Sequence, residues 1–210
     1  YGNLQQEELA KIKADLDEYD IQDQTAVRRF YAWLLNIAML KADFPAAREL
    51  VHKVRSLQEK PAQKLTSGLV VEAIINAFET GGSDFHSALR ANLHQSLRAL
   101  PYQEVQDVLK TTKASTEIAS RNLVLAGIAS TLDPAAEGGT LSQDLAMGIL
   151  NSAYSLQYFI PNKEDVLAAY TAILDANTAE RKPDIWEARG GALDGGQTTT
   201  PVVVGIWDSG

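Results

Sequence analysis

Apolar residues in the first 180 positions recur at the spacing of helical faces. Residues 4–19 carry one apolar residue every three to five positions, which predicts one face of an amphipathic helix. Residues 24–41 are apolar over more than one face, and a helix of this kind usually lies centrally in its domain. We therefore expect the second helix to be buried on several sides.

Capping residues and helix breakers predict where the later helices begin and end. Asp43 is a candidate N-cap with Pro45 in the first helical turn, where the missing proline N–H costs nothing. Asn162 is a candidate cap for the last helix, and Ser83 or Asp84 for an earlier one. One predicted helix follows Asp43 within residues 42–60, and another starts at Pro101. The others cover 63–79, about 84–100, 118–132, roughly 141–158 and 162–179, with a loop at 133–139.

Eight or nine helices with short connections predict an all-α fold. Such a series forms either an irregular multi-helix bundle or a degenerate α-solenoid. Residues 32–57, AWLLNIAMLKADFPAARELVHKVRSL, loosely resemble a tetratricopeptide-type helical hairpin, although no clean repeat recurs elsewhere. We expect the irregular bundle first and the TPR-like solenoid second.

The composition changes after residue 180. Residues 180–201, ERKPDIWEARGGALDGGQTTTP, contain four glycines, two prolines and three threonines, with one amphipathic patch at Ile185-Trp186. We expect a helical domain over 1–180, a linker over 181–201, and a β-strand from a further α/β domain over 202–210.

Charge and cysteine content exclude several classes of function. The net charge of −8 argues against general nucleic-acid binding, which requires a basic face. The absence of cysteine excludes disulfides, zinc–thiolate sites and cysteine nucleophiles. No run of 18 apolar residues occurs, so we expect no membrane span, and no motif indicates a metal or cofactor. The expected partners are proteins or peptides.

The last residues carry the most specific pattern in the chain. Residues 203–210, VVGIWDSG, place an aspartate, a serine and a glycine at the end of a predicted strand. This stretch resembles the start of the catalytic domain in subtilisin-like serine proteases (subtilases). The resemblance implies that Asp208 is the triad aspartate, which orients the catalytic histidine. The histidine and the nucleophilic serine would then lie beyond Gly210, and Trp207 departs from the smaller aliphatic residue common there.

Other interpretations of this motif stay open. Aspartic proteases also place Asp-Ser/Thr-Gly after an apolar strand, but there other strands come shortly before it. Asp208 could also be an ordinary turn residue.

The subtilase resemblance implies a role for the helical residues. They would be an N-terminal pro-region, inhibitor, folding aid or interaction module of a secreted or cell-envelope endopeptidase, with the protease domain as partner. The alternative is a helical-repeat binding domain unrelated to any enzyme. Because the chain starts at Tyr1 and ends directly after the aspartate, we expect a piece cut or processed at both ends. The linker is a candidate processing site.

Four further groups are better explained by structure than by chemistry. His52, His86 and His94 form no metal-binding pattern, since His86 and His94 lie two helical turns apart. Arg28-Arg29 precede an aromatic segment, where core packing is expected. Gly81-Gly82-Ser83 reads as a helix stop. A solvated face is expected for the acidic residues of the first helix and the turn after it, which are Glu7, Glu8, Asp15, Asp17, Glu18, Asp20 and Asp23.

Overall fold

The computed structural model describes residues 2–18, 23–132, 134 and 142–178. Within these ranges the chain is predominantly helical and contains no strand, so the all-α prediction is confirmed there. The chain divides into two units, Tyr1–Asn177 and Thr178–Gly210, and the described residues belong to the first apart from Thr178. The predicted linker at 181–201 and strand at 202–210 lie outside the described residues.

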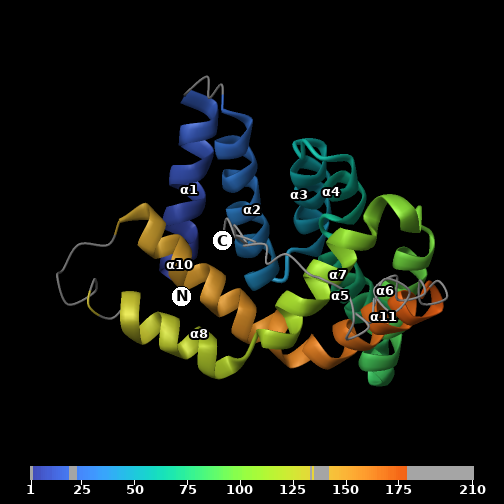
Figure 1. The fold of residues 1–210 in the computed structure, drawn as a ribbon. Coiled ribbons are helices and arrows are strands. Elements are labelled where there is room, and N and C mark those ends of the chain that lie inside the picture. The colour runs from blue at the N-terminus through green and yellow to red at the C-terminus, as the bar shows by residue number, and fades with distance from the viewer. Residues whose placement is uncertain (1, 19–22, 133, 135–141, 179–210) are drawn as a thin grey trace, which may run out of the picture. The chain divides into compact units, whose positions relative to one another are not determined.

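Ten α-helices make up most of the described part of the chain (Figure 1). Short 3₁₀ turns occur at Gly82–Asp84 and Ile160–Asn162, and π-helical turns at Ile128–Leu132 and Ser155–Phe159. The α-helices are α1 (Gly2–Glu18), α2 (Gln24–Leu40), α3 (Phe44–Ser56), α4 (Pro61–Thr66), α5 (Leu69–Thr80), α6 (Phe85–Arg98), α7 (Tyr102–Ile118), α8 (Arg121–Gly127), α10 (Gln143–Tyr154) and α11 (Lys163–Ala176).

Helix α2 is shared by two hydrophobic cores, which confirms its predicted central position. Its residues Leu35, Ala38 and Met39 belong to a large core completed by α3, α5, α6, α7, α11 and the π-helical turn at Ser155–Phe159. Its other face, with Leu34 and Ile37, packs into a smaller core with α1 and α10. A helix that is apolar around most of its circumference can serve both cores at once.

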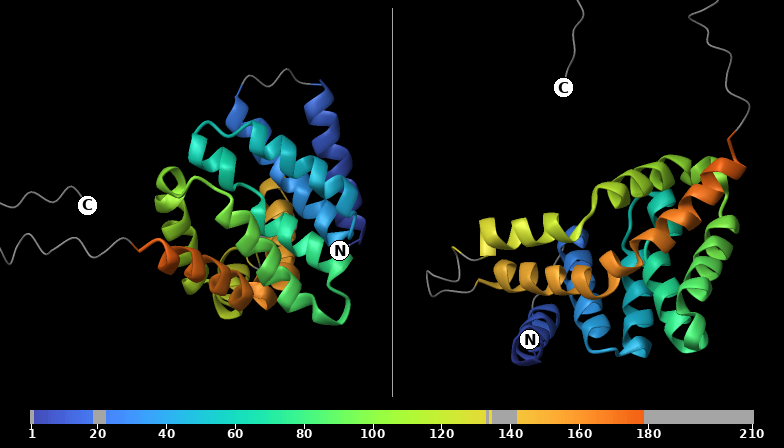
Figure 2. Two further views of the ribbon diagram at one scale, coloured as in Figure 1. Left: turned by 90° about the vertical axis from the view of Figure 1, so that its right-hand side faces the viewer. Right: turned by 90° about the horizontal axis from the view of Figure 1, so that it is seen from below.

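The remaining helices pack against one another in two groups, one beside α2 and one that includes α5, α6, α7 and α11. Helix α1 lies beside α2, and α10 packs against both of them (Figure 1). Helices α5 and α6 form a hairpin, and α11 packs against α6 and α7. Figure 2 shows α8 running beside α10, where the π-helical turn after α8 contacts α10.

The predicted start of α3 is confirmed in detail. The Asp43 side chain accepts a hydrogen bond from the backbone N–H of Ala46 at 3.2 Å, and Pro45 lies in the first turn. Asp23, Ser120 and Ser142 cap α2, α8 and α10 in the same way. A side-chain oxygen here satisfies one of the N–H groups that a helix start leaves unpaired.

Two predicted helices differ in the structure, one by a break and the other by a later start. Gly68 has a φ of +81° and breaks the helix predicted over 63–79 into α4 and α5. Ser120 caps α8 and separates it from α7, so the helix predicted over 118–132 begins later. An isolated glycine inside an apolar pattern is compatible with helix, so periodicity alone does not reveal such a break.

Two predicted cap residues, Asp84 and Asn162, occupy the N-cap positions of α6 and α11 but make no side-chain capping hydrogen bond. The Asn162 side chain is buried and donates instead to the backbone carbonyl oxygen of Tyr158 at 2.7 Å. The loop predicted at 133–139 lies outside the described residues, except for Pro134.

Candidate functional site

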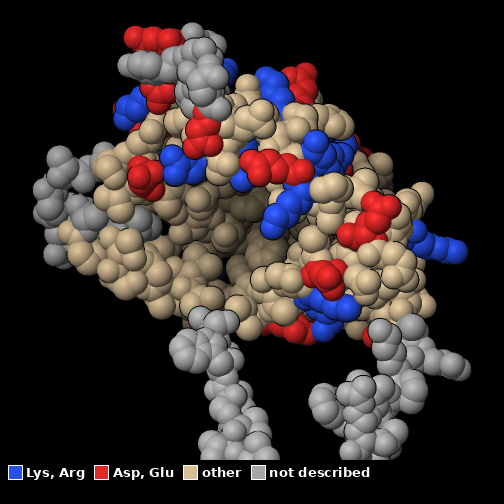
Figure 3. Space-filling model, turned by 45° about the horizontal axis from the view of Figure 1, so that its top comes forward, with Lys and Arg blue, Asp and Glu red and all other residues tan. Residues whose placement is uncertain are grey.

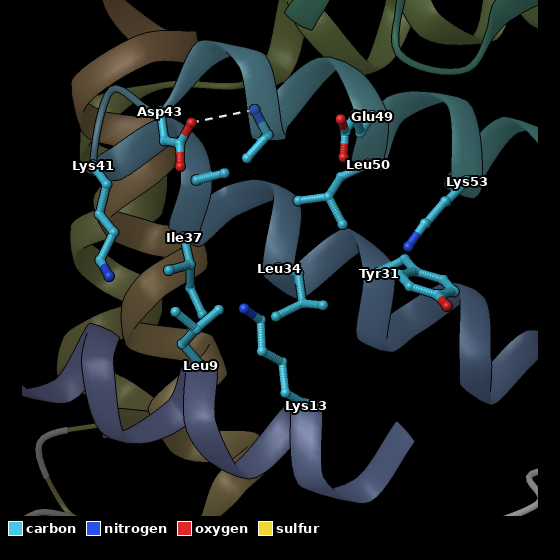
Figure 4. Close-up of a pocket in the computed structure, with 12 residues that line it drawn as sticks. Leu9, Lys13, Tyr31, Leu34, Ile37, Lys41, Asp43, Glu49, Leu50 and Lys53 are labelled. Atoms are coloured by element: carbon cyan, nitrogen blue, oxygen red, sulfur yellow. Dashed lines mark hydrogen bonds between the residues drawn. The ribbon is translucent and has the colours of Figure 1, made fainter. Parts of the chain in front are cut away.

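The clearest concave site lies on α2 between α1 and α3. Helices α1 and α3 both pack against α2, and the groove between them has a volume of about 490 Å³ (Figure 4). Its floor is apolar and consists of Leu9, Leu34, Ile37, Ala38, Ala46 and Leu50. Leu34 and Ile37 are also members of the smaller core, so the floor is held by the packing of the domain itself.

Three lysines from three elements stand around this floor. Lys13 comes from α1, Lys41 follows the last residue of α2, and Lys53 comes from α3. Lys13 and Lys53 point toward α2 from opposite sides (Figure 4). The Lys53 ammonium lies 5.0 Å from the centre of the Tyr31 ring, a cation–π distance that holds the side chain over the groove.

Two carboxylates share the rim with the lysines. Asp43 caps the N-terminus of α3, where it accepts a hydrogen bond from the Ala46 N–H. Glu49 is exposed and makes no ion pair with any residue that the structure describes. Lys13 and Lys41 likewise form no ion pair within the described ranges. The groove therefore combines an apolar floor with a local excess of positive charge.

Charged side chains elsewhere on the surface are mixed in sign. Figure 3 shows lysine, arginine and acidic residues next to one another along the rim of one face, whose central hollow is lined by uncharged residues.

A buried carboxylate joins α6 to α11. Asp165 is 6% exposed and accepts hydrogen bonds from His86 at 2.6 Å and from Arg90 at 2.7 Å. This aspartate–histidine pair resembles part of a catalytic triad, but no hydroxyl group hydrogen-bonds His86 among the described residues. The arginine is a second partner that fixes the carboxylate. The arrangement is that of an ion pair that connects two helices.

A second cavity of about 420 Å³ lies between α4, α5, α7 and α11. Its lining includes Arg28, whose side chain donates to Gln58 at 3.2 Å, and Tyr170. Burial raises the pKa of Tyr170 to about 12, and it raises the pKa of Tyr154 to about 12 as well. Both hydroxyls are therefore neutral at physiological pH, and neither is an activated nucleophile or base.

The structure places the other predicted candidates apart from one another. His52 on α3 is exposed, and His94 on α6 lines a third cavity with Arg98 and Tyr102. The described residues contain no group of three or more histidine, aspartate or glutamate side chains that could hold a metal ion. Gly81 caps the end of α5, consistent with the predicted helix stop.

Asp208, the predicted triad aspartate, lies outside the described residues. In the predicted pair Arg28-Arg29, the Arg29 guanidinium lies 5.1 Å from the centre of the Trp33 ring, in line with the expected aromatic packing. No helix among the described residues is long and apolar enough to cross a membrane.

Sequence reasoning missed two features. Glu8, expected on a solvated face, is only 1% exposed, with Lys11 bound to one of its oxygens. The groove was also missed, since its three lysines are far apart in sequence and share no spacing pattern. The Ala-Asp-Phe turn that brings α3 back onto α2 was the one available signal.

Comparison of the chain with protein-family models, with curated proteins and with solved structures found no match.

Proposed function

We propose that this chain is the helical N-terminal region of a subtilisin-like serine endopeptidase and is itself catalytically inert. The observation that carries the proposal is the sequence VVVGIWDSG, in which Asp208-Ser209-Gly210 follow an apolar run. In this proposal Asp208 orients the histidine that deprotonates the nucleophilic serine, and both partners follow Gly210.

In this proposal catalysis belongs to Asp208 and not to the helical unit. The pair of Asp165 with His86 has Arg90 as its third member and no serine or threonine hydroxyl on the histidine among the described residues. An acyl-transfer site needs a nucleophile within hydrogen-bond reach of its base.

The role proposed for the helical unit is protein interaction within the parent enzyme, with the groove on α2 as the contact surface. A pro-region that inhibits the protease or aids its folding is the other form of the same proposal. A tetratricopeptide-like relationship of the α2–α3 hairpin and a secreted or cell-envelope location belong to this proposal too.

A helical binding domain that is no part of an enzyme is the second candidate. The groove favours it, because an apolar floor with charged residues at its rim is a general peptide-binding arrangement. The two candidates differ in one respect that can be measured, which is the reactivity of the full-length protein toward reagents for serine hydrolases.

The test uses the full-length protein with a fluorophosphonate probe, which labels activated serines. We expect labelling of the wild type, and Asp208→Asn should lower peptidase kcat by roughly 10⁴-fold because the histidine loses its orienting carboxylate. Asp194→Asn, in the predicted linker, is the matched control and should leave kcat unchanged. A full-length protein that the probe does not label, or an Asp208→Asn variant as active as wild type, would contradict the proposal.

A separate measurement distinguishes the two forms of the role. Tight inhibition of the protease domain by the added helical unit, with cleavage between Glu180 and Pro201 during maturation, would support a pro-region. Retention of an intact linker without inhibition would support an interaction module.

A further inference from the structure

We propose that the α1–α2–α3 groove binds a peptide segment in which apolar side chains alternate with acidic residues. The inference rests on the proposed interaction role of the helical unit and names the chemistry of its partner. It does not depend on whether the parent protein is a subtilase.

The floor of the groove accounts for the apolar part of the partner. Leu34 and Ile37 come from α2, while Leu9 and Leu50 reach in from the flanking helices, so apolar side chains line the groove from three sides. Leu9 and Leu50 are only partly buried, although they pack against the smaller core. A volume of about 490 Å³ falls within the ordinary range of ligand sites, so the groove holds several side chains of a peptide.

The lysines account for the acidic part of the partner. Lys13, Lys41 and Lys53 project from three different elements around one floor, so only the tertiary structure brings them together. The chain as a whole carries a net charge of −8, and a site with three ammonium groups is therefore unusual on its surface. Such a site attracts carboxylates and repels a basic partner.

The two carboxylates of the rim, Asp43 and Glu49, reduce this positive charge but do not cancel it, because three ammonium groups line the same groove. One oxygen of Asp43 accepts a hydrogen bond from the Ala46 N–H at the start of α3, where the helix dipole favours a negative group. Glu49 makes no ion pair with a lysine of the rim, although Lys53 stands one helical turn away. Lys13 and Lys41 therefore remain available for the carboxylates of a partner, within the part of the chain that the structure describes.

Fluorescence anisotropy with the helical chain tests the proposal. The probe is a short fluorescein-labelled peptide in which Glu and Asp alternate with Leu and Phe. One control peptide replaces the acidic residues with Lys, and a second replaces the apolar residues with Ser. We expect the acidic apolar peptide to bind more tightly than both controls, with an affinity that falls as salt is added.

Charge reversal locates the binding to the groove. Lys13→Glu, Lys41→Glu and Lys53→Glu together should weaken binding at least about tenfold, since three ion pairs are replaced by repulsion. The matched control reverses Lys60, Lys64 and Lys110, which are exposed lysines outside the groove. If the triple variant does not fold, Lys13→Gln with Lys41→Gln keeps Lys53 over Tyr31 and should still weaken binding severalfold.

Four results would overturn the proposal. The first is no binding of the acidic apolar peptide up to millimolar concentration, and the second is equally tight binding of the lysine peptide. The third is an equal loss of affinity in the control variant. The fourth is a dimer, seen in sedimentation velocity, that the charge reversal in the groove dissociates. The last would make a second copy of the chain the occupant. Failure of fluorophosphonate labelling would contradict the subtilase assignment alone, because peptide binding is measured on the helical chain.

Discussion

Gly68 lies against Val51 so closely that no side chain fits between them. A Cβ atom built on Gly68 would stand 2.3 Å from the Val51 Cγ1 atom, and the φ of +81° is one that residues with a side chain rarely adopt. Val51 is 1% exposed and packs in the large core, so a shift of its side chain would disturb that packing. The break between α4 and α5 therefore depends on glycine at this position.

Gly68→Ala should lower the free energy of unfolding by about 3 kcal/mol, from the strained φ together with the overpacking of Val51. Two glycines provide controls for urea denaturation. Gly82 has a φ of +50°, but a Cβ atom built on it would have no neighbouring atom within 4 Å. Gly82→Ala should therefore lower the free energy of unfolding by only about 1 kcal/mol. Gly127→Ala, in α8 with open space around it, should be neutral or slightly stabilising. Equal losses for all three variants would contradict this explanation.

Tyr158 connects the π-helical turn before α11 to the end of α2. Its hydroxyl donates to the Met39 carbonyl oxygen at 2.8 Å, and both residues are buried. Tyr158→Phe should cost about 1 kcal/mol, at the low end for a buried hydrogen bond because this carbonyl also accepts from the Ala42 N–H at 2.9 Å. Tyr102→Phe, which removes a hydroxyl without a hydrogen bond among the described residues, is the control, and an equal loss there would refute the prediction.

Glu8 is a buried carboxylate with a hydrogen-bond partner on only one of its two oxygens within the described residues. Lys11 donates to one oxygen at 2.8 Å, while the other oxygen has no partner among the described residues. Glu8→Met should therefore raise the free energy of unfolding by about 1 kcal/mol, because a poorly compensated desolvation is removed. Glu7→Met, exposed on the same helix, should change it by less than about 0.5 kcal/mol. A loss of stability in the Glu8 variant would show that the ion pair contributes more than its desolvation costs.

The buried phenol of Tyr170 should make the protein less stable at alkaline pH. Burial raises its pKa to about 12 in the folded protein, so the folded state keeps the phenol proton at a pH where the unfolded chain loses it. The stabilisation is complete below the unfolded pKa of about 10 and disappears as the pH rises toward the folded value. Between these two pH values the free energy of unfolding should fall by about 2 kcal/mol less in Tyr170→Phe than in wild type. Urea unfolding over a pH series measures this difference. Parallel curves for the two proteins would contradict the prediction.

The sequence was most informative about the elements themselves. The period of the apolar positions predicted the all-α class and the central place of α2, because burial on several sides requires an apolar surface on several sides. The Asp43 cap was also predictable, since its hydrogen bond is made within four residues. Such local interactions leave their pattern in neighbouring positions.

Interactions between distant residues were not predictable in this way. The burial of Glu8 depends on the packing of α1, which contacts α2 and α10, and the groove depends on three lysines from separate elements. Ile118 and Leu123, two apolar residues of the helix predicted over 118–132, are 73% and 58% exposed, and they lie on different helices because α7 ends at Ile118 and Ser120 caps the start of α8. Tertiary packing decided each of these outcomes.

The floor of the groove belongs at the same time to the smaller core, and this shared use couples occupancy to folding. Leu34 and Ile37 hold α1 and α10 to α2, so a partner that covers them binds only the folded domain. By mass action, a peptide at a hundred times its Kd would raise the free energy of unfolding by about 2.7 kcal/mol. Thermal stability would then report how full the groove is, and proteolytic resistance of α1 would rise with the concentration of the partner.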